Sequence, residues 1–331
     1  MSSFCFRLNL FRMQRIWGIC GLILCTVIFC GCCQECSTSS PDQTKPAEQQ
    51  TKPTADASPS EPSPVQAAVD AMKSDVPVTL ESCGAKVDLN KGGSVKAVDF
   101  SNAKLLATSV FNAADLGKLS SARVVRGRGP IFPTVFKACE GMNRLTEFLW
   151  TDAAAEAVNF KFFSSKGELK KVRLTGLKTD SIAEILKTLG ASASLVDLDI
   201  SGSTLADTDL AVFAAGGFKK LTRLNLYQTG TTNRGVESLL PLAGQLVWLN
   251  LDATAVTDDG CKNIAMFKSL TFLHLGRTMI SDAAAESIAS IPSLKTLHVT
   301  RTAMTEKGFK LLKEKLPECE LITVVVDQDK K

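Results

Sequence analysis

The chain has two histidines, His274 and His298, and their separation of 24 residues makes them the first candidates for metal chemistry. Two imidazoles at equivalent places of a repeated structure would suit two ligands of one metal ion. A third ligand would have to come from Asn250, Asp252 or Thr323, and two histidines with an amide make a poor zinc site. The sequence has no nucleophile elbow, phosphate-binding glycine loop, His-Glu-x-x-His motif or calcium loop. We therefore expect no metal, no cofactor and no catalytic residue.

Residue types that are common in binding surfaces surround the two histidines. The chain's only tyrosine, Tyr227, and one of its three tryptophans, Trp248, occur among arginines and asparagines. Aromatic and arginine side chains dominate binding hot spots, and the pair Arg277 and Arg301 would also suit a carboxylate, sulfate or uronic acid group. Alternatively, Trp248 and Phe272 only cover the structure beneath them or pack under a loop. The candidate binding residues are Arg223, Asn225, Tyr227, Trp248, Asn250, Asp252, Phe272, His274, Arg277, His298 and Arg301.

A repeated leucine signature predicts the elements that hold these residues. It occurs six times between Leu169 and Val299, at steps of 24 to 26 residues. Apolar residues at positions 1, 4 and 6 of each frame point inward from a short strand, and positions 3 and 5 point outward. The strong frames are Leu169-x-x-Val172-x-Leu174, Leu195-x-x-Leu198-x-Ile200, Leu221-x-x-Leu224-x-Leu226, Leu246-x-x-Leu249-x-Leu251, Leu270-x-x-Leu273-x-Leu275 and Leu294-x-x-Leu297-x-Val299. Weaker frames bring the number of strand positions to ten, at Val95-x-x-Val98-x-Phe100, Leu119-x-x-Ala122-x-Val124, Leu145-x-x-Phe148-x-Trp150 and Cys319-x-x-Ile322-x-Val324.

Each strand is expected to lead through a turn into a helix. Hydroxyls at position 9 can satisfy backbone groups of the turn, and the residues there are Thr229, Thr254, Thr278 and Thr302. A hydroxyl followed by a carboxylate indicates a helix start at Thr179-Asp180, Thr257-Asp258, Ser281-Asp282 and Thr305-Glu306. Apolar columns at positions 16 and 19 predict the helix side that faces the strands, and they contain Leu210, Val236, Cys261, Ala285 and Phe309, then Phe213, Leu239, Ile264, Ile288 and Leu312.

This pattern resembles the bacterial leucine-rich repeats that carry Thr at position 9 and a Thr/Ser-Asp-x-Gly helix start, as in Thr257-Asp258-Asp259-Gly260. The resemblance covers residues 95–326. It implies an α/β leucine-rich repeat solenoid (horseshoe), with a parallel β-sheet on the concave side and helices on the convex side. Positions 3 and 5 then place the candidate binding residues on the concave face. The resemblance does not identify a ligand.

The N-terminal region has the composition of an export signal followed by a spacer. Residues 1–31 contain three arginines, no acidic residue and an apolar run that ends at Gly31. Cys32 follows this run in a setting that resembles the bacterial lipoprotein signal, so we expect cleavage and lipid attachment there. An uncleaved anchor and conventional cleavage are the alternatives. Because Cys33 rather than Asp follows Cys32, the analogy favours the outer membrane. Residues 32–64 are rich in Pro, Ser, Thr and Gln and predict a disordered stalk.

Further segments are expected at both ends of the repeats. Residues 65–94 predict an N-terminal cap, with an amphipathic helix that opens at Ser63-Pro64 and a hairpin that turns at Asn90-Lys91-Gly92-Gly93. The repeat domain spans 95–326, and the charged tail 327–331 guards an open sheet edge. In the second repeat Gly127 and Gly129 depart from the pattern, so we expect an irregular loop. Its arginines form a second candidate site, at Arg123, Arg126 and Arg128.

Charge and cysteine usage exclude several classes of protein. Removal of residues 1–31 leaves 35 basic and 34 acidic residues, and this net charge of +1 argues against a nucleic-acid partner. Seven of the eleven cysteines lie at or before Cys36, and the other four have neither a zinc spacing nor a disulfide framework. Cys261 and Cys319 are expected to be small buried apolar residues.

These observations predict an exported, lipid-anchored, monomeric and non-enzymatic binding protein of the cell envelope. It presents its concave face to a protein or to an envelope glycan. Two alternatives from other classes stay open. One is a structural envelope protein whose repeats pack laterally without a discrete ligand, and the other is a metal-dependent enzyme that uses His274 and His298.

Overall fold

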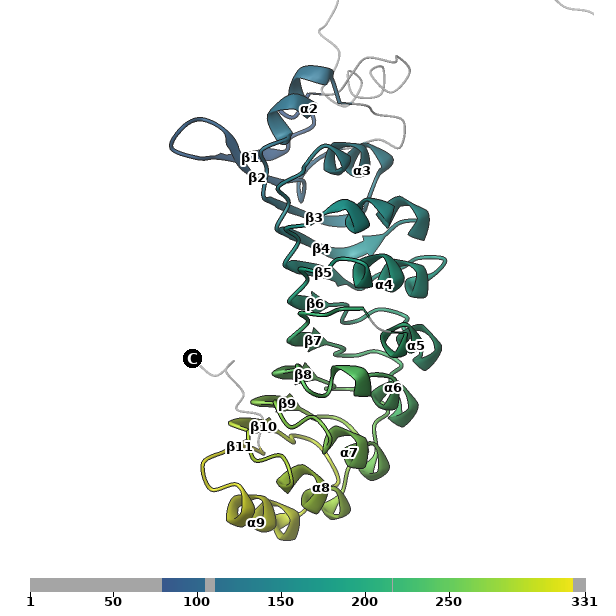
Figure 1. Cartoon of the computed structure of the whole chain (residues 1–331), viewed down its shortest axis with the longest axis vertical. Helices are drawn as coiled ribbons and strands as arrows, with labels where there is room; N and C mark the ends of the chain where they lie inside the picture. The colour runs from purple at the N-terminus through teal and green to yellow at the C-terminus, as the bar shows by residue number, and fades with distance from the viewer. Residues whose placement is uncertain (1–78, 105–110, 216, 324–331) are drawn as a thin grey trace, which may run out of the picture. The chain divides into compact units, whose positions relative to one another are not determined.

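The computed structural model describes residues 79–104, 111–215 and 217–323. Within these ranges, eleven strands form one sheet in which spatial order follows chain order (Figure 1). All neighbouring strands are parallel except the first two, which are antiparallel. The strands are β1 (Lys86–Leu89), β2 (Val95–Asp99), β3 (Val124–Pro130), β4 (Glu147–Ala154), β5 (Lys171–Thr175), β6 (Asp197–Asp199), β7 (Arg223–Asn225), β8 (Trp248–Asn250), β9 (Phe272–His274), β10 (Thr296–His298) and β11 (Glu320–Ile322).

The helices lie on one side of this sheet, and each connects two successive parallel strands (Figure 1). They are α2 (Ala113–Leu119), α3 (Pro133–Glu140), η1 (Ala157–Ser165), α4 (Ile182–Gly190), α5 (Asp207–Ala214), α6 (Asn233–Ser238), η2 (Leu240–Leu242), α7 (Asp258–Ile264), η3 (Asp282–Ala284), α8 (Ala285–Ala289) and α9 (Glu306–Lys315). Ten parallel strands, β2 to β11, match the ten predicted strand positions. The fold is therefore the predicted leucine-rich repeat solenoid.

The predicted hairpin before the first repeat is confirmed. β1 pairs antiparallel with β2, with Val87 opposite Val98. The turn closes with a hydrogen bond from the Gly93 amide to the Asn90 carbonyl (2.9 Å), and Gly93 has φ +78°, where a side chain would be strained. The predicted export signal, Cys32, the stalk, the amphipathic helix from Ser63 and the tail from Asp327 lie outside the described residues. No helix in the described ranges has the length and hydropathy of a membrane span.

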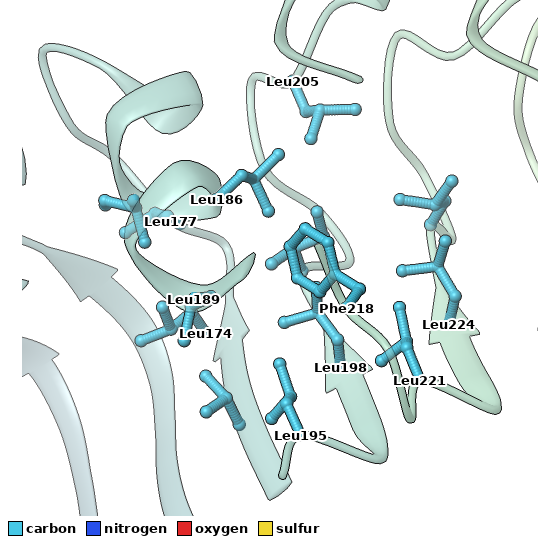
Figure 2. Packing of buried hydrophobic residues seen from close by; sticks show 14 of the residues in the cluster. Leu174, Leu177, Leu186, Leu189, Leu195, Leu198, Leu205, Phe218, Leu221 and Leu224 are labelled. Carbon is cyan, nitrogen blue, oxygen red and sulfur yellow. The ribbon is translucent and has the colours of Figure 1, made fainter. Parts of the chain in front are cut away.

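The six strong frames have the predicted register, and their leucines form one continuous core. Side chains at positions 1, 4 and 6 of these frames are at most 2% exposed. Figure 2 shows how Leu195 and Leu198 from one repeat lie against Leu189 from the preceding helix and Phe218 from the following turn. Full burial of one such side chain contributes about 1.5–3 kcal/mol. Because the core side chains of each repeat pack against those of its neighbours, no repeat buries its core side alone.

The frames predicted for the second and last repeats are wrong. Val125, not Ala122, pairs with Val98 and Phe148, so the second frame is shifted by three residues. Leu321, not Ile322, pairs with Leu297, so the last frame is shifted by one. Cys319 is consequently only half-buried, whereas Cys261 is fully buried as predicted. Burial raises the pKa of the Cys261 thiol to about 12, so it stays protonated.

The irregular loop predicted around Gly127 is also wrong, because β3 continues as a strand from Val124 to Pro130. Gly127 occupies an inner position at which a Cβ atom would overlap the indole ring of Trp150. The missing side chain makes room for this ring, which is 2% exposed and donates from Nε1 to the Gly129 carbonyl (2.7 Å). The glycine therefore preserves the strand instead of breaking it.

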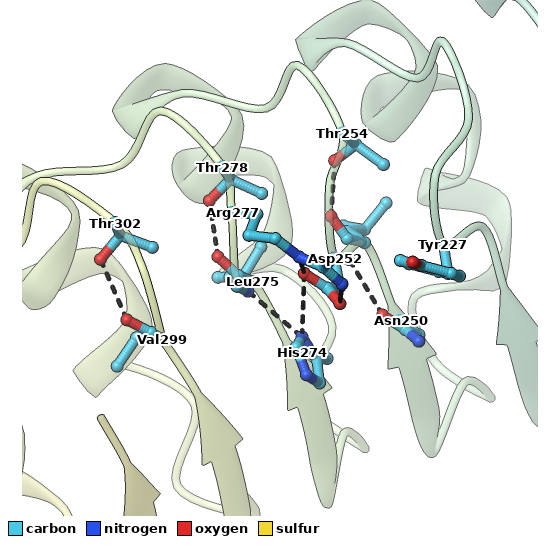
Figure 3. A network of polar contacts seen from close by, with 12 residues as sticks. Tyr227, Asn250, Asp252, Thr254, His274, Leu275, Arg277, Thr278, Val299 and Thr302 are labelled. Atoms are coloured by element: carbon cyan, nitrogen blue, oxygen red, sulfur yellow. Dashed lines mark hydrogen bonds and ion pairs between the residues drawn. The ribbon is translucent and has the colours of Figure 1, made fainter. Parts of the chain in front are cut away.

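The strand exits share one backbone turn. Position 8 has a left-handed conformation in seven successive repeats, with φ between +50° and +68°, at Asp152, Gly176, Gly202, Gln228, Ala253, Arg277 and Arg301. The predicted role of the position 9 threonines is confirmed. The hydroxyl of Thr278 donates to the Leu275 carbonyl at 2.6 Å, and Figure 3 shows equivalent bonds at Thr254 and Thr302. These bonds hold a turn that is unfavourable for residues other than glycine.

The helix starts predicted at Thr257, Ser281 and Thr305 are confirmed, and the Ser281 and Thr305 hydroxyls cap their helices. The Thr257 hydroxyl makes no cap bond and instead accepts from Asn233 Nδ2 at 2.8 Å. The start predicted at Thr179-Asp180 is wrong by two residues, because Ser181 caps α4 and accepts from the Glu184 amide at 3.3 Å. Ser181 also offers a hydroxyl, so the dipeptide pattern alone did not distinguish the two positions.

In four successive repeats, the Asp or Asn that follows the N-cap contacts the next repeat. Asp258 accepts from the Ser281 amide and hydroxyl, both at 2.7 Å, and Asp282 accepts from the Thr305 amide at 2.7 Å and hydroxyl at 2.6 Å. We call these contacts the helix-start bridges. The other pairs are Asp207 with Thr232 and Asn233 with Thr257. The bridges connect five successive repeats on the helix side.

Candidate binding surface

The structure places the eleven candidate residues on four adjacent repeats, at the strands β7 to β10 and the turns that follow them. Positions 3 and 5 lie on the strands, as predicted, and hold Arg223, Asn225, Trp248, Asn250, Phe272, His274 and His298. Positions 7 and 8 lie in the strand exits and hold Tyr227, Asp252, Arg277 and Arg301. The surface is therefore formed by side chains that are distant in sequence and adjacent across the sheet.

Five of these side chains stack on one another, and we call Arg223, Trp248, Phe272, His298 and His274 the aromatic row. The Arg223 guanidinium lies 4.5 Å from the centre of the Trp248 ring. The Trp248 and Phe272 rings are nearly parallel, at 9° and 4.7 Å between centroids. The Phe272 and His298 centroids are 5.3 Å apart, and the two imidazoles stack at 4.4 Å. Stacked and cation–π pairs each add about 0.5–1.5 kcal/mol, so the row is arranged before any partner binds.

Tyr227, Asp252 and Arg277 form a second group, the exit cluster (Figure 3). Arg277 contacts Asp252 with two hydrogen bonds, one of them from Nε to Oδ1 at 2.9 Å, and its guanidinium lies 5.2 Å from the centre of the Tyr227 ring. The Asp252 side chain is 9% exposed, so this ion pair is screened from water on the carboxylate side. The cluster holds Arg277 in one orientation.

The predicted pairing of Arg277 and Arg301 around one anion has no support in the geometry. Arg277 turns back to Asp252, which compensates its charge. Arg301 is exposed and has no ion-pair partner among residues 79–104, 111–215 and 217–323. Only Arg301 of this pair therefore offers an uncompensated charge within the described surface.

The side chains at position 5 have a structural role that the sequence analysis missed. Asn225 and Asn250 accept, through Oδ1, a hydrogen bond from the amide two residues further on, at 3.1 and 2.9 Å. His274 does the same through Nδ1, which accepts from the Gly276 amide at 3.2 Å. Asp99 and Asp199 make the same contact in earlier repeats. A short polar side chain two residues before a turn amide is the available sequence signal, because Asn and Asp commonly close such turns.

Both histidines are uncharged near neutral pH. The pKa of His274 is lowered to about 4, mainly by burial; the Asp252 carboxylate opposes the shift, and the nearby His298 and Arg277 add to it. Burial also lowers the pKa of His298. Because the Gly276 amide donates to Nδ1 of His274, its ring proton resides on Nε2.

The hydrogen bond of His274 and the side chains around both histidines also test the alternative of a metal site. His274 Nδ1 is already bonded, and in the described part of the chain no three His, Cys, Asp or Glu side chains are arranged to hold a metal ion. Nothing in the donor set around the two rings therefore supplies the third ligand that a zinc site requires.

Charges elsewhere on the sheet face compensate one another. Asp197 lies 3.5 Å from Lys171 and 3.7 Å from Arg223, and Asp199 lies 3.1 Å from Arg173. The second candidate site has the same character, with ion pairs that join Arg123 to Glu168, Arg126 to Asp88 and Arg128 to Asp152. These surface pairs each stabilise by about 1 kcal/mol or less. The aromatic row borders this paired region at Arg223, which contacts both Asp197 and the Trp248 ring.

Comparison with known proteins finds only distant structural likenesses. No protein-family model matches the sequence, and no curated protein matches it. Similar solved structures include internalin C2 of Listeria monocytogenes, at 20% identity and a TM-score of 0.45 over 67% of this chain and 87% of that chain. Internalin F of the same organism is 15% identical, with a TM-score of 0.44 over 67% and 73%. A leucine-rich repeat protein of Leptospira interrogans is 15% identical, with a TM-score of 0.43 over 68% and 60%.

Ten parallel strands in register with a repeated leucine frame decide the architecture. The chain has the architecture of a leucine-rich repeat solenoid. Neither the fold nor these likenesses specify what such a protein binds. The evidence for function is therefore in the side chains of the surface itself.

Proposed function

We propose that the chain is a non-enzymatic binding protein whose aromatic row and exit cluster recognise a protein partner. The observation that carries this proposal is the stack of Arg223, Trp248, Phe272 and His298 across four neighbouring strands. Tryptophan, tyrosine and arginine are the side chains most often responsible for binding energy in protein interfaces. Their concentration on one rigid face supports recognition more than it supports catalysis.

Rigidity is the second support. Stacking fixes the rings of the row, and the ion pair with Asp252 fixes Arg277. Immobilising a flexible side chain on binding costs about 0.5–1.5 kcal/mol, and side chains that are already ordered avoid this cost. The sheet beneath them is continuous from β2 to β11, so the surface is preorganised at the levels of both side chain and backbone.

Export and anchoring are part of the proposal and rest on sequence alone. We infer that residues 1–31 direct export, that Cys32 becomes the lipid-bearing N-terminus, and that the following Pro-rich segment separates the repeats from an envelope membrane. Such an arrangement would give the sheet face access to partners beyond the membrane surface.

Site-specific photo-cross-linking tests the binding surface. A photoreactive residue at Gln228, which is exposed beside Tyr227, should produce a defined adduct with one protein in cells that make the full chain. The same residue at Met266, which is 60% exposed, should not produce this adduct. Equal adducts from both positions, or none from Gln228, would instead favour an envelope element without a discrete ligand.

A further inference from the structure

The position 5 side chains of the binding surface offer hydrogen-bond donors to solvent. Asn225 and Asn250 use Oδ1 to accept from the backbone, which leaves the Nδ2 groups as their free ends. His274 uses Nδ1 in the same way and keeps its proton on Nε2. No buried side-chain nitrogen or oxygen in the described ranges lacks a partner, so these three free donors must reach solvent.

The carboxylates near these donors are already engaged. Asp252 is bonded twice to Arg277, and Asp199 accepts from Arg173 at 3.1 Å and from the Ser201 hydroxyl at 2.7 Å. Asp197 lies within 3.7 Å of two cations. The surface therefore has an excess of available donors over available acceptors around β7 to β9.

The aromatic row adds positive potential in the same place. Arg223 covers one face of the Trp248 ring and Phe272 covers the other, so the half-buried indole presents its edge. Ring edges carry the positive end of the aromatic quadrupole, whereas ring faces carry the negative end. Arg301, which is exposed and has no ion-pair partner in the described ranges, lies at one end of this region, and Arg223, which lies 3.7 Å from Asp197, is at the other end.

We propose that this surface binds an extended acidic peptide segment of the partner, with Asp or Glu side chains and backbone carbonyls as acceptors for the donor row. This inference rests on the proposed function and specifies its ligand. At a strand spacing of about 4.8 Å, the donors from Asn225 to His274 span about 10 Å, the length of about three extended residues. Arg301, in the strand exit of the next repeat, can then meet an acidic side chain at one end of this segment.

The geometry is less suited to a glycan. Sugar rings bind aromatic side chains by stacking on an open ring face, and both faces of Trp248 are covered. The Tyr227 ring is likewise approached by the Arg277 guanidinium at 5.2 Å. A sulfated or uronic acid glycan would have to bind through its anions alone.

Selection from a phage-displayed library of random dodecapeptides on the full chain tests the proposal without assuming a partner. Selected sequences should be enriched in Asp and Glu over the unselected library, and a synthetic selected peptide should bind more weakly as salt concentration rises. An oligogalacturonate, as an anionic glycan probe, should not compete for the peptide.

Two charge variants locate the binding. Asn250→Asp keeps the oxygen that closes the turn and replaces the free donor with an acceptor, so it should weaken peptide binding by about tenfold or more. Asn263→Asp, the same change on helix α7, should leave binding unchanged. Arg301→Gln should weaken binding by about tenfold, and Arg234→Gln on helix α6 should not. Melting temperatures of all four variants show whether each is folded.

The outcomes separate the two proposals. Neutral peptides whose binding is lost in Trp248→Ala would overturn the acidic ligand and leave the protein-binding surface intact. Peptides that bind all variants equally, or a library that yields no binder, would count against both the acidic ligand and the protein-binding surface. Competition by oligogalacturonate would replace the peptide with an anionic glycan.

Discussion

His274 connects stability and the proposed recognition surface at the level of a single residue. Its Nδ1 closes the strand exit, and its ring ends the aromatic row by stacking on His298. Protonation of Nδ1 would break the bond from the Gly276 amide and would place a positive charge near Arg277. Burial is the main reason why the pKa of this ring lies well below its ordinary value, and the nearby charge of Arg277 adds to the shift.

The lowered pKa predicts a specific loss of stability in acid. Below pH 6.5 the unfolded chain protonates His274, whereas the folded chain does so only near pH 4. Stability from this residue is therefore complete above pH 6.5 and is lost as the pH falls toward 4. Chemical denaturation should show that wild type loses more unfolding free energy over this range than His274→Asn, by about 3 kcal/mol at most.

His274→Asn is a matched control, because Asn225 and Asn250 close the same turn with an amide that does not titrate. Parallel pH profiles of the two proteins would show that His274 is not the group that titrates.

Only some residue roles were predictable from the sequence. The position 9 threonines were, because one residue type recurs at one position and its hydroxyl has a local acceptor. The turn role of position 5 was not, since Asp, Asn and His share it. The contact between Asp252 and Arg277 was also missed, because it joins residues 25 apart and depends on a left-handed turn at Arg277.

At the scale of elements, the helix-start bridges explain the Gly of the Thr/Ser-Asp-x-Gly pattern. A Cβ atom at Gly260 would overlap Oδ1 of Asn233, the acceptor of the Thr257 amide, and would lie 2.8 Å from Val256 Cγ1. Gly235 and Gly308 meet the bridging carboxylates of Asp207 and Asp282 in the same way. The glycine is therefore required by the neighbouring repeat and by the turn that precedes its own helix.

Gly260→Ala should consequently destabilise the protein. Alanine within a helix normally stabilises by about 1 kcal/mol relative to glycine, but here it must displace the bridge, and we expect a net loss of about 1–3 kcal/mol. Urea unfolding measures the effect. Gly244→Ala is the control, since its Cβ would meet nothing within 4 Å. A Gly260→Ala protein as stable as wild type would refute this role of the bridge.

The elements were predictable where leucines fill the inner positions. The six strong frames have the correct register because positions 1, 4 and 6 are all large and apolar. The second frame failed because Gly127 leaves its inner position to the Trp150 ring, which belongs to the next repeat. The prediction of the last frame failed because Glu318 occupies position 1, where the repeat pattern requires an apolar residue. A side chain of one repeat that fills space left by a small residue of another cannot be recognised from the sequence of one repeat alone.

At the scale of the whole molecule, stability is transmitted from repeat to repeat. Deletion of the residues after Ser293 would remove β10, α9 and β11 and expose the core side of the preceding repeat. We expect a shift toward aggregation with part of the helical circular dichroism signal retained, because upstream repeats keep their own neighbours. Complete loss of structure would mean that the repeats fold as one cooperative unit.

The period of 24 to 26 residues was sufficient to predict the solenoid, because such a unit must stack on its neighbours to bury its apolar side. The candidate binding surface was predictable as a set of outward positions. Its internal stacking was not, because side-chain geometry across strands depends on neighbours that the repeat pattern does not specify.

The proposed anchor makes a separate prediction for the full chain. Intact-mass analysis of native protein should find an N-terminus at Cys32 that carries lipid, because Cys32 alone follows Gly at the end of the apolar run. Cys32→Ser should change processing and membrane partition. A mature chain that begins elsewhere, or a Cys32→Ser protein that behaves as wild type, would contradict lipid attachment.

The affinity of the cross-linked partner for Trp248→Ala, compared with Lys262→Ala, tests the central claim most directly. Trp248 stacks at the centre of the row, whereas Lys262 lies exposed on the helix side beside Asp259. We predict a loss of about 2 kcal/mol, roughly thirtyfold, for Trp248→Ala and at most about 0.5 kcal/mol for Lys262→Ala. Arg277→Ala should also cost about 2 kcal/mol, and its melting curve must be checked because it leaves Asp252 unpaired. Equal affinities of Trp248→Ala and wild type, at unchanged melting temperature, would contradict a binding role for the sheet face.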